Sequence, residues 1–386
     1  MSPLDQDLDH ELASLKAADR LRRCPEMSGL SRTHGPVDGA PSLAFSSNDY
    51  LGLATHPALA LAAAQSLATT GFGSGASRLV SGDFSEHRDL ESALARYLQR
   101  PAALLFPTGY QANLGVFSAL AGPQDLVVSD ASNHASIIDG CRLSKPTVSI
   151  YPHANATAAA QALAAPGSFR RRFLVTESLF SMDGDAAPLA ALADAARAAQ
   201  AIFVVDEAHA FGVLGPSGRG LSAAAGIFPD VLVATLGKAF GTFGGFVAGS
   251  PQLRAILVNR ARTFIFTTAP PPSLAAAACA ALALVAGTEG DRLRTELQAR
   301  TRRLHDRLRG TNLLPPWTLA GPIVPLLAGT DAAALALAAR LRQAGIFVQP
   351  IRPPTVPEGT ARLRVTLSAA HTDDDVDRLA EALLGA

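Results

Sequence analysis

Seven short apolar runs recur between residues 102 and 248, and they constrain the fold more than any other feature of the chain. Several are rich in β-branched residues, and they alternate with Ala/Leu-rich segments that are long enough for helices. The runs occupy residues 102–106, 125–129, 147–151, 172–176, 201–205, 231–235 and 244–248. Continuous rather than alternating hydrophobicity is typical of strands covered on both faces. Strands that alternate with helices predict an α/β fold with a mostly parallel central sheet flanked by helices.

The remaining segments predict two smaller parts. Leu4, Leu8, Leu12 and Leu15 recur at helical spacing, so we expect an amphipathic N-terminal helix and an arm over residues 1–45. The large α/β domain then covers residues 46–286. From residue 287 onward the sequence changes to a charged helix (291–310), further short strands and a proline-rich loop. This texture predicts a smaller C-terminal α+β domain over residues 287–386.

Composition excludes several classes of protein. The 33 basic residues balance the 33 acidic ones, whereas a protein that holds a polyanion usually shows a basic excess, so we expect no nucleic-acid partner. Three cysteines without a C-x-x-C pair argue against a disulfide scaffold and a zinc ribbon, and no metal is expected. The N-terminus is acidic and amphipathic, unlike a signal peptide, and the apolar window 273–287 is too short to span a bilayer. We therefore expect a cytoplasmic protein without a membrane partner.

The tetrapeptide D-E-A-H at residues 206–209 invites a helicase interpretation. Such a box needs a phosphate-binding loop, G-x-x-x-x-G-K-[ST], upstream on the same sheet. The only Gly-Lys pair, Gly237-Lys238, is followed by alanine and lies downstream. The segment GFGSGAS (71–77) also lacks the G-x-G-x-x-G spacing of a dinucleotide site. A flexible loop near a ligand or a subunit contact is the better interpretation of that segment.

Lys238 is the strongest candidate for amine chemistry. It is one of three lysines, follows the apolar run that ends at Thr235, and has small neighbours that let a bulky ligand approach. A surface lysine in a glycine turn is the alternative. An amine held at such a place can form a Schiff base with pyridoxal phosphate. Asp206, 32 residues earlier, is a carboxylate that could keep the pyridine nitrogen of this cofactor protonated.

The other groups of the cofactor also have candidate partners. Its phosphate needs backbone amides at a helix start together with hydroxyl groups. Gly109 and Tyr110 provide a strand-to-helix turn, and Thr235 provides a hydroxyl. His209 could contact the phenolic oxygen of the cofactor or lie in the substrate pocket.

Six motifs, in this order, resemble those of the α-oxoamine synthases, a family of class-II pyridoxal-phosphate-dependent transferases. The motifs are S-S-N-D-Y-L-G-L (46–53), P-T-G-Y-Q-A-N (107–113), S-N-H-A-S (132–136), F-S-M-D-G-D-A-A-P-L (180–189), D-E-A-H (206–209) and T-L-G-K-A-F-G-T-F-G-G (235–245). The resemblance implies fold type I, pyridoxal 5'-phosphate as cofactor, and a homodimer with shared active sites. It also implies the joining of an amino acid to an acyl thioester with loss of carbon dioxide. Residues 351–371 look most like the member that uses L-alanine and a pimeloyl thioester, carried on coenzyme A or an acyl carrier protein.

The resemblance also implies a role for each matching residue. Four residues would form the catalytic group around the cofactor: Lys238, Asp206, His134 and His209. His134 would stack on the exposed face of the cofactor ring. Six further residues would bind the cofactor, mostly at its phosphate: Gly109, Tyr110, Ser181, Thr235, and, from the neighbouring subunit, Thr267 and Thr268. Five residues would contact the substrates: Arg22, Asn48, His134, Thr355 and Arg364.

Several alternatives remain open at this stage. Arg364 could be a plain surface charge, and Arg22 could belong to a solvated basic cluster with Arg20 and Arg23. Another α-oxoamine synthase, such as 2-amino-3-ketobutyrate ligase, 5-aminolevulinate synthase or serine palmitoyltransferase, would share every cofactor residue. An aminotransferase of the same fold and a nucleic-acid-dependent ATPase are the more distant rivals.

Overall fold

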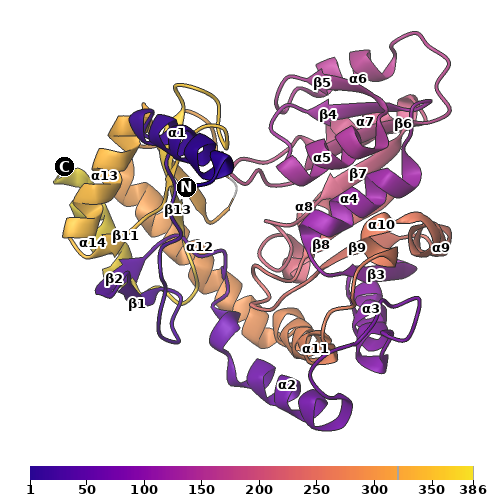
Figure 1. The fold of residues 1–386 in the computed structure, drawn as a ribbon, viewed down its shortest axis with the longest axis horizontal. Helices are drawn as coiled ribbons and strands as arrows, with labels where there is room; N and C mark the ends of the chain where they lie inside the picture. Colours follow the sequence, from indigo (N-terminus) through magenta and orange to yellow (C-terminus); the bar gives the residue numbers. More distant parts are fainter. Residues whose placement is uncertain (320, 386) are drawn as a thin grey trace. The chain divides into compact units, whose positions relative to one another are not determined.

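The structure, a computed structural model, describes residues 1–319 and 321–385, which form two compact units. Unit 1 comprises residues 1–47, 182–184 and 298–386, and unit 2 comprises residues 48–181 and 185–297. Unit 1 therefore combines the N-terminal arm with the C-terminal segment. The division falls inside one long helix, α12 (Thr288–Leu308). Figure 1 shows the elements of both units.

A seven-stranded sheet forms the centre of unit 2, in the order β3-β9-β8-β7-β6-β4-β5. Every neighbouring pair is parallel except the two pairs that involve β9. The strands are β3 (Ala102–Phe106), β4 (Leu126–Asp130), β5 (Thr147–Tyr151), β6 (Arg172–Glu177), β7 (Ile202–Asp206), β8 (Val231–Thr235) and β9 (Gly245–Gly249). All seven predicted runs are strands, with boundaries shifted by at most one residue, and the predicted α/β class is confirmed.

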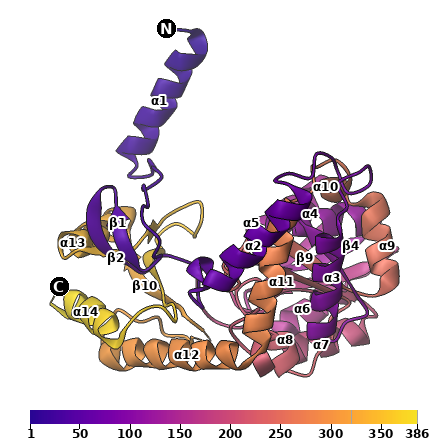
Figure 2. The ribbon, with the colours of Figure 1, turned by 90° about the horizontal axis from the view of Figure 1, so that it is seen from below.

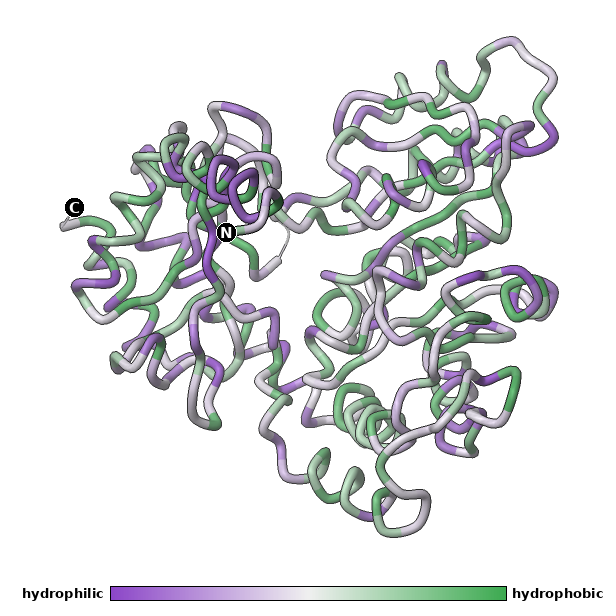
Figure 3. The backbone as a smooth tube through the Cα atoms, viewed as in Figure 1, coloured by the Kyte–Doolittle hydropathy of each residue, from purple (hydrophilic) through white to green (hydrophobic). Residues whose placement is uncertain are grey.

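Helices cover both faces of this sheet. One buried cluster joins Phe117 of α4 and Phe264 of α10 to the strands through side chains such as Val175, and a second joins Leu192 of α7 to neighbours such as Leu174. Leu174 and Val175 are adjacent in β6, so successive side chains enter opposite clusters, which explains why the apolar runs are continuous. Figure 3 accordingly shows hydrophobic colour along the central strands.

The helices of unit 2 alternate with its strands or follow them. They are α2 (Pro57–Thr70), α3 (Ser85–Tyr97), α4 (Gly109–Leu120), α5 (Ala135–Ser144), α6 (Ala156–Leu163), α7 (Leu189–Ala198), α8 (Leu221–Ala224), α9 (Pro251–Arg260), α10 (Arg262–Ile265) and α11 (Pro272–Ala286), with short 3-10 helices at Leu53–Thr55 and Pro216–Gly218. Within the described residues no single helix is long and apolar enough to cross a bilayer. The consecutive helices α11 and α12 pass that test only as a pair, by length and composition, and they are bent by 71°.

Unit 1 contains two three-stranded sheets, β1-β2-β11 and β10-β13-β12. Its elements are α1 (Pro3–Ala17), β1 (His34–Val37), β2 (Ala40–Ala44), β10 (Ile323–Gly329), α13 (Asp331–Gln343), β11 (Ile346–Phe347), β12 (Pro350–Ile351), β13 (Ala361–Thr366) and α14 (Asp373–Leu384). The helix expected around Leu4–Leu15 is present as α1, yet it contains no buried residue. Figure 2 shows it projecting from β1 and β2.

Candidate active site

Four parallel strands of unit 2 end on a polar residue at one edge of the sheet. These last residues are Asp130 of β4, Glu177 of β6, Asp206 of β7 and Thr235 of β8. The loops that follow them carry His134, Ser181, His209 and Lys238. Because parallel strands present their carboxyl ends together, residues that lie up to a hundred positions apart in sequence meet at this edge.

Lys238 lies in a chain of polar contacts. Its Nζ is 2.7 Å from Nε2 of His209, and Nδ1 of His209 is 2.7 Å from the hydroxyl of Tyr50. The Tyr50 hydroxyl donates its one proton to Oδ1 of Asn48 at 3.1 Å. His209 Nδ1 must therefore donate to Tyr50, which leaves Nε2 as the acceptor of a Lys238 proton. The sequence placed His209 near the cofactor, but it did not indicate the contacts with Lys238 and Tyr50.

Asp206 is buried and held by two donors. Its Oδ2 accepts a hydrogen bond from Nδ2 of Asn113 at 2.7 Å, and its Oδ1 accepts one from the amide of Ala208 at 2.9 Å. The same Asn113 amide group donates to Oγ of Ser136, which is 2.8 Å from Nδ1 of His134. Two helices, α4 and α5, thus fix the orientation of this carboxylate and of His134.

His134 remains exposed although its Nδ1 edge is bonded. Partial burial of the ring lowers its pKa; the negative charge of Asp206 opposes that shift and the positive charge of Lys238 reinforces it. The ring also meets Tyr110 edge to face, with centroids 6.3 Å apart. A neutral imidazole with an accessible face is suited to stacking on a flat heterocycle. The charges of Asp206 and Lys238 both act on His134, so both residues lie within electrostatic range of its ring.

The start of α4 provides the expected anion site. Thr108 caps this helix by accepting a hydrogen bond from the amide of Gln111. The first two helical amides, those of Gly109 and Tyr110, have no partner within the helix because no helical carbonyl precedes them. Gly245 of β9 packs so closely that a Cβ there would lie 2.3 Å from the Gly109 nitrogen. Within the chain, the hydroxyl of Thr235 donates to Gly244 O at 2.9 Å and accepts from Gly237 N at 3.2 Å, and its expected contact with the phosphate stays a prediction. Thr235 therefore shapes the turn that presents Lys238.

Two buried glutamates at this edge, Glu177 and Glu207, were not predicted from the sequence. Glu207 accepts hydrogen bonds from the Ser178 hydroxyl and from the amides of Leu221 and Ser222, so it anchors the loop after β7. Glu177 lies in register with Asp206 on the neighbouring strand, and among the residues that the structure describes its Oε1 has no hydrogen-bond partner. Burial, and then the charge of Asp206, raise the pKa of Glu177 to about 8, so it carries its proton at neutral pH.

Three further residues of unit 2 are predicted to bind the cofactor: Ser181, Thr267 and Thr268. Ser181 is buried in the loop after β6, four residues beyond Glu177 at the carboxyl end of that strand. Thr267 and Thr268 follow α10 at the surface, where Phe266 is 70% exposed. Within the described part of the chain, the Thr267 hydroxyl donates to the carbonyl of Thr268 at 3.4 Å. Their predicted role still depends on a second subunit.

The predicted substrate residues of unit 1 fall into two groups. Arg22 donates through Nη2 to Pro353 O at 3.0 Å and lies 3.5 Å from the hydroxyl of Thr355, so the structure brings these two exposed residues together. The neighbouring Arg20 and Arg23 pair instead with Glu358 and Asp38. Arg364 lies on β13 and is only 7% exposed, so it is not a surface charge.

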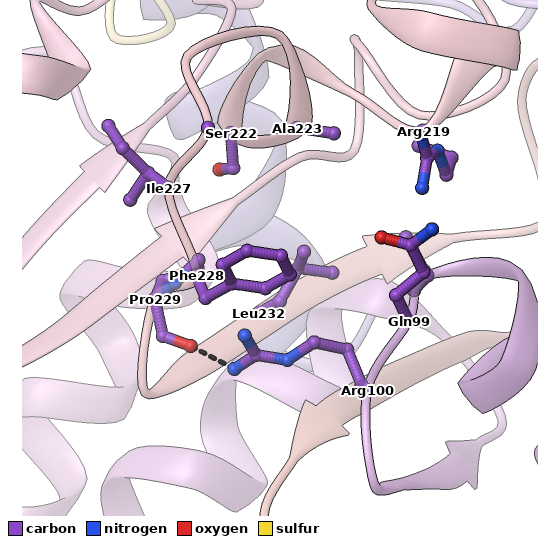
Figure 4. A pocket seen from close by; sticks show the side chains of 11 residues that line it. Gln99, Arg100, Arg219, Ser222, Ala223, Ile227, Phe228, Pro229 and Leu232 are labelled. Carbon is purple, nitrogen blue, oxygen red and sulfur yellow. Dashed lines mark hydrogen bonds between the residues drawn. The ribbon is translucent and has the colours of Figure 1, made fainter.

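A small hollow of unit 2 lies away from this edge. It has a volume of about 60 Å³ and is bounded by Leu232, near the start of β8, and by Phe228, Arg100 and Ser222 (Figure 4). Phe228 lies over the guanidinium of Arg100, which donates to Pro229 O. The residues that line it include none of the predicted site residues. The described residues also contain no group of three or more His, Cys, Asp or Glu side chains arranged to hold a metal.

Comparison with known proteins points to one family. The model of aminotransferase class I and II matches residues 40–383. The 8-amino-7-oxononanoate synthase of Marinobacter nauticus is 47% identical over 383 residues, covering 98% of this chain and 95% of the relative. The structure of a lysine-to-alanine variant of serine palmitoyltransferase from S. paucimobilis, with a bound pyridoxal phosphate–myriocin aldimine, has a TM-score of 0.92 at 30% identity, covering 100% of both chains. That of 8-amino-7-oxononanoate synthase from Francisella tularensis has a TM-score of 0.76 at 29% identity, covering 89% of this chain and 96% of that one.

Fold and site together define a pyridoxal-phosphate-dependent transferase of aminotransferase class I and II. Within that class, the chain belongs to the 8-amino-7-oxononanoate synthase family. The D-E-A-H tetrapeptide accordingly has no helicase role: its Asp206 and His209 lie in the site around Lys238, and its Glu207 is structural.

Proposed function

We propose that the protein joins L-alanine to a pimeloyl thioester, releasing carbon dioxide and a free thiol and forming 8-amino-7-oxononanoate. A carbon–carbon bond forms between the α-carbon of alanine and the carbonyl carbon of the thioester. The carbon–sulfur bond of the thioester breaks, and so does the bond between the α-carbon and the carboxylate carbon of alanine. The observation that carries this proposal is the contact of Lys238 Nζ with His209 Nε2 at 2.7 Å, in a region that the charges of Asp206 and Lys238 share. The name of the curated relatives supports the product.

The residues present fit pyridoxal phosphate. When bound, it supplies an aldehyde that condenses with amines and a protonated pyridine ring that withdraws electrons from the substrate. Lys238 would hold the aldehyde carbon, and Asp206 would hold the pyridine nitrogen. His134 would cover the ring, and the amides of Gly109 and Tyr110 would bind the phosphate. The dense packing of Gly245 against Gly109 supports that last role, because it leaves the start of α4 no room to shift.

Asp206 is preorganised for its task. Two donors already orient its carboxylate, and a fixed anion beside a pyridine nitrogen raises the pKa of that nitrogen and keeps it protonated. Glu177, next to Asp206 and carrying its proton, adds no second negative charge at neutral pH. A single anion is therefore directed at the ring nitrogen.

Lys238 would also move the α-proton of the amino acid. In this role it must accept a proton as a free amine and release it again. His209 Nε2 accepts a hydrogen bond from Nζ and thereby directs the amine, while Tyr50 fixes the tautomer of His209. General-base catalysis of this kind contributes roughly 10²–10⁴-fold to a rate.

The substrate contacts and the assembly belong to the same proposal. Arg364 would bind the alanine carboxylate with Asn48 close by, and Arg22 and Thr355 would contact the acyl chain or the product. A homodimer would bring Thr267 and Thr268 to the phosphate of the other subunit. The free cysteines Cys24, Cys141 and Cys279 support a reducing, cytoplasmic location. The division into a large cofactor domain (46–286) and a smaller C-terminal domain (287–386) also remains part of the proposal.

Two measurements test this function. Borohydride reduction of the purified protein with pyridoxal phosphate should attach the cofactor to the single peptide that contains Lys238. Mixing with L-alanine and pimeloyl-CoA, or pimeloyl-acyl carrier protein, should then release free thiol and carbon dioxide in equal amounts. Label on another lysine would sink the cofactor assignment. Amino-group exchange without thiol release would instead indicate an aminotransferase.

A sister activity is separated by substrate choice. The similarity to serine palmitoyltransferase makes serine the most informative competitor, and glycine covers the other two sister enzymes. Thiol release should be fastest with L-alanine and a pimeloyl thioester among alanine, serine and glycine, each tested with pimeloyl, palmitoyl, acetyl and succinyl donors. A preference for serine with a palmitoyl donor would overturn the assignment.

A further inference from the structure

His153 is held between two carboxylates in unit 2. Its Nδ1 is 2.9 Å from Oδ1 of Asp130, and its Nε2 is 2.9 Å from Oδ2 of Asp185. The Asp130 side chain is fully buried, and those of His153 and Asp185 are 30% and 16% exposed. A carboxylate only accepts, so both ring nitrogens must donate and the ring is an imidazolium.

The two carboxylates belong to different loops. Asp130 ends β4 and accepts from the amide of Ser132 at 2.8 Å and from that of Ala154 at 2.9 Å, which shapes the turn that leads to His134. The carbonyl of Asp185 accepts from the amide of Phe180 at 2.9 Å and closes the turn that contains Ser181. Both loops emerge from neighbouring strands at the edge where Lys238 lies.

We propose that His153 is a positioning residue that ties the loop of His134 to the loop of Ser181. Within the described chain it contacts neither His134 nor Ser181. It acts by fixing the Asp130 carboxylate, which shapes one loop, and the side chain of Asp185, whose backbone carbonyl closes the other. The importance of this link for catalysis rests on the proposed function, whereas the link itself rests only on contacts within unit 2.

His153 keeps its positive charge over a wide range of pH. Burial lowers the pKa of the ring, but the hydrogen bonds and charges of Asp130 and Asp185 outweigh it and raise the pKa to about 10. Tyr151 on β5 and Glu177 on β6 are titratable groups near Asp130. Burial raises the pKa of Tyr151 further above its ordinary range, and burial together with nearby charges, that of Asp130 included, raises the pKa of Glu177. His153 therefore stays a cation from weakly acidic to weakly alkaline pH.

Packing alone is the rival explanation. The ring of His153 meets Phe180 edge to face with centroids 4.3 Å apart, and its loss could simply weaken the unit as a whole. A link and a packing contact differ in what they protect. The link protects two particular loops, whereas general packing protects the whole unit evenly.

Hydrogen exchange of the full chain, with and without pyridoxal phosphate, separates the two. In the His153→Gln variant we expect on the order of tenfold faster exchange at the amides of Ser132, Ala154 and Phe180, with the amides of β7 and β8 unchanged. The dissociation constant of pyridoxal phosphate should rise on the order of tenfold. His10→Gln, at an exposed position of α1, is the matched control and should behave as the parent protein.

Asp185→Asn dissects the link further, and it decides the matter if the first variant does not fold. It keeps the contact of His153 with Asp130, so only the Phe180 amide should exchange faster, together with weaker cofactor binding. Unchanged exchange at Phe180, or equally faster exchange throughout unit 2, overturns the proposal. If the parent protein does not bind pyridoxal phosphate, the proposed function fails, while the exchange result without cofactor still tests the link.

Discussion

The carboxyl-end edge of the large sheet and the Arg22–Thr355 region differ in burial and in how their side chains are held. At the sheet edge Asp206 and His209 are 6% and 4% exposed and have their bonding partners in place. Arg22 and Thr355 are exposed, and Arg22 is held mainly by carbonyl oxygens of a proline-rich loop. A resident cofactor rewards rigid preorganisation, because its position decides the chemistry. A substrate that enters and leaves at every turnover favours an accessible site.

Lys238→Ala should have the largest effect. Removing the Lys238 amine should lower turnover at least about a thousandfold, because both covalent attachment and proton transfer are expected to depend on it. Steady-state thiol release measures the loss, and circular dichroism checks the fold. The exposed Lys145→Ala is the control. An alanine variant that retained a tenth of parental activity would contradict the central role of the sheet edge.

Asp206→Asn should follow, with a loss of kcat of roughly 10²–10³-fold. Asparagine keeps the size of the side chain but removes the charge that keeps the cofactor nitrogen protonated. The KM for L-alanine should change little, because Asp206 is expected to bind no substrate. The exposed Asp194→Asn, whose partner is Arg197, controls for loss of a carboxylate elsewhere. A change confined to KM would move Asp206 from the cofactor to the substrate.

Arg22→Ala should affect only the other region. We expect the KM for the pimeloyl thioester to rise about tenfold while kcat stays near the parental value, as for a residue that binds substrate and transition state equally. Arg23→Ala is a close control, because Arg23 is the neighbouring arginine and pairs with Asp38 instead. Equal effects of the two substitutions would show that general charge, rather than the contact with Thr355, explains the change.

Glu177→Gln should leave activity at neutral pH nearly intact and should change the dependence of stability on pH. The folded-state pKa of Glu177 is raised to about 8 from an ordinary 4.5, so its stabilising contribution is complete below 4.5 and is lost as pH rises toward 8. Glutamine mimics the protonated form and does not ionise. The variant should therefore gain stability over the parent across this window, approaching about 5 kcal/mol above pH 8. Urea unfolding of the apoprotein between pH 5 and 9 would show this, and a difference independent of pH would contradict it.

Local sequence patterns predicted much of the fold and part of the candidate site. The seven apolar runs predicted all seven strands of the sheet because a strand buried on both faces must be apolar at consecutive positions. The scarcity of lysine and the small neighbours of Lys238 were enough to single it out. The motifs then extended the prediction to His134 and Ser181, which the structure places on loops at the same edge.

The hydrogen-bond partners of the site residues could not be predicted from the sequence. Tyr50 is 159 positions from His209, and Asn113 is 93 positions from Asp206, so no local pattern connects them. Both lie inside motifs, N-D-Y and Q-A-N, and those motifs were the one available signal. Helical spacing likewise predicted α1 correctly, but it could not show that its leucines stay exposed within this chain.

The sequence by itself determined which segments become strands, which amine is available and which carboxylate follows the right strand, because these depend on the periodicity and chemistry of neighbouring residues. Only the tertiary structure decided that His209 bonds Lys238, that Asn113 orients Asp206, and that Glu177 lies beside Asp206 with its proton retained. Those properties arise where the carboxyl ends of separate strands converge, and burial and charge there depend on residues that are distant in the chain.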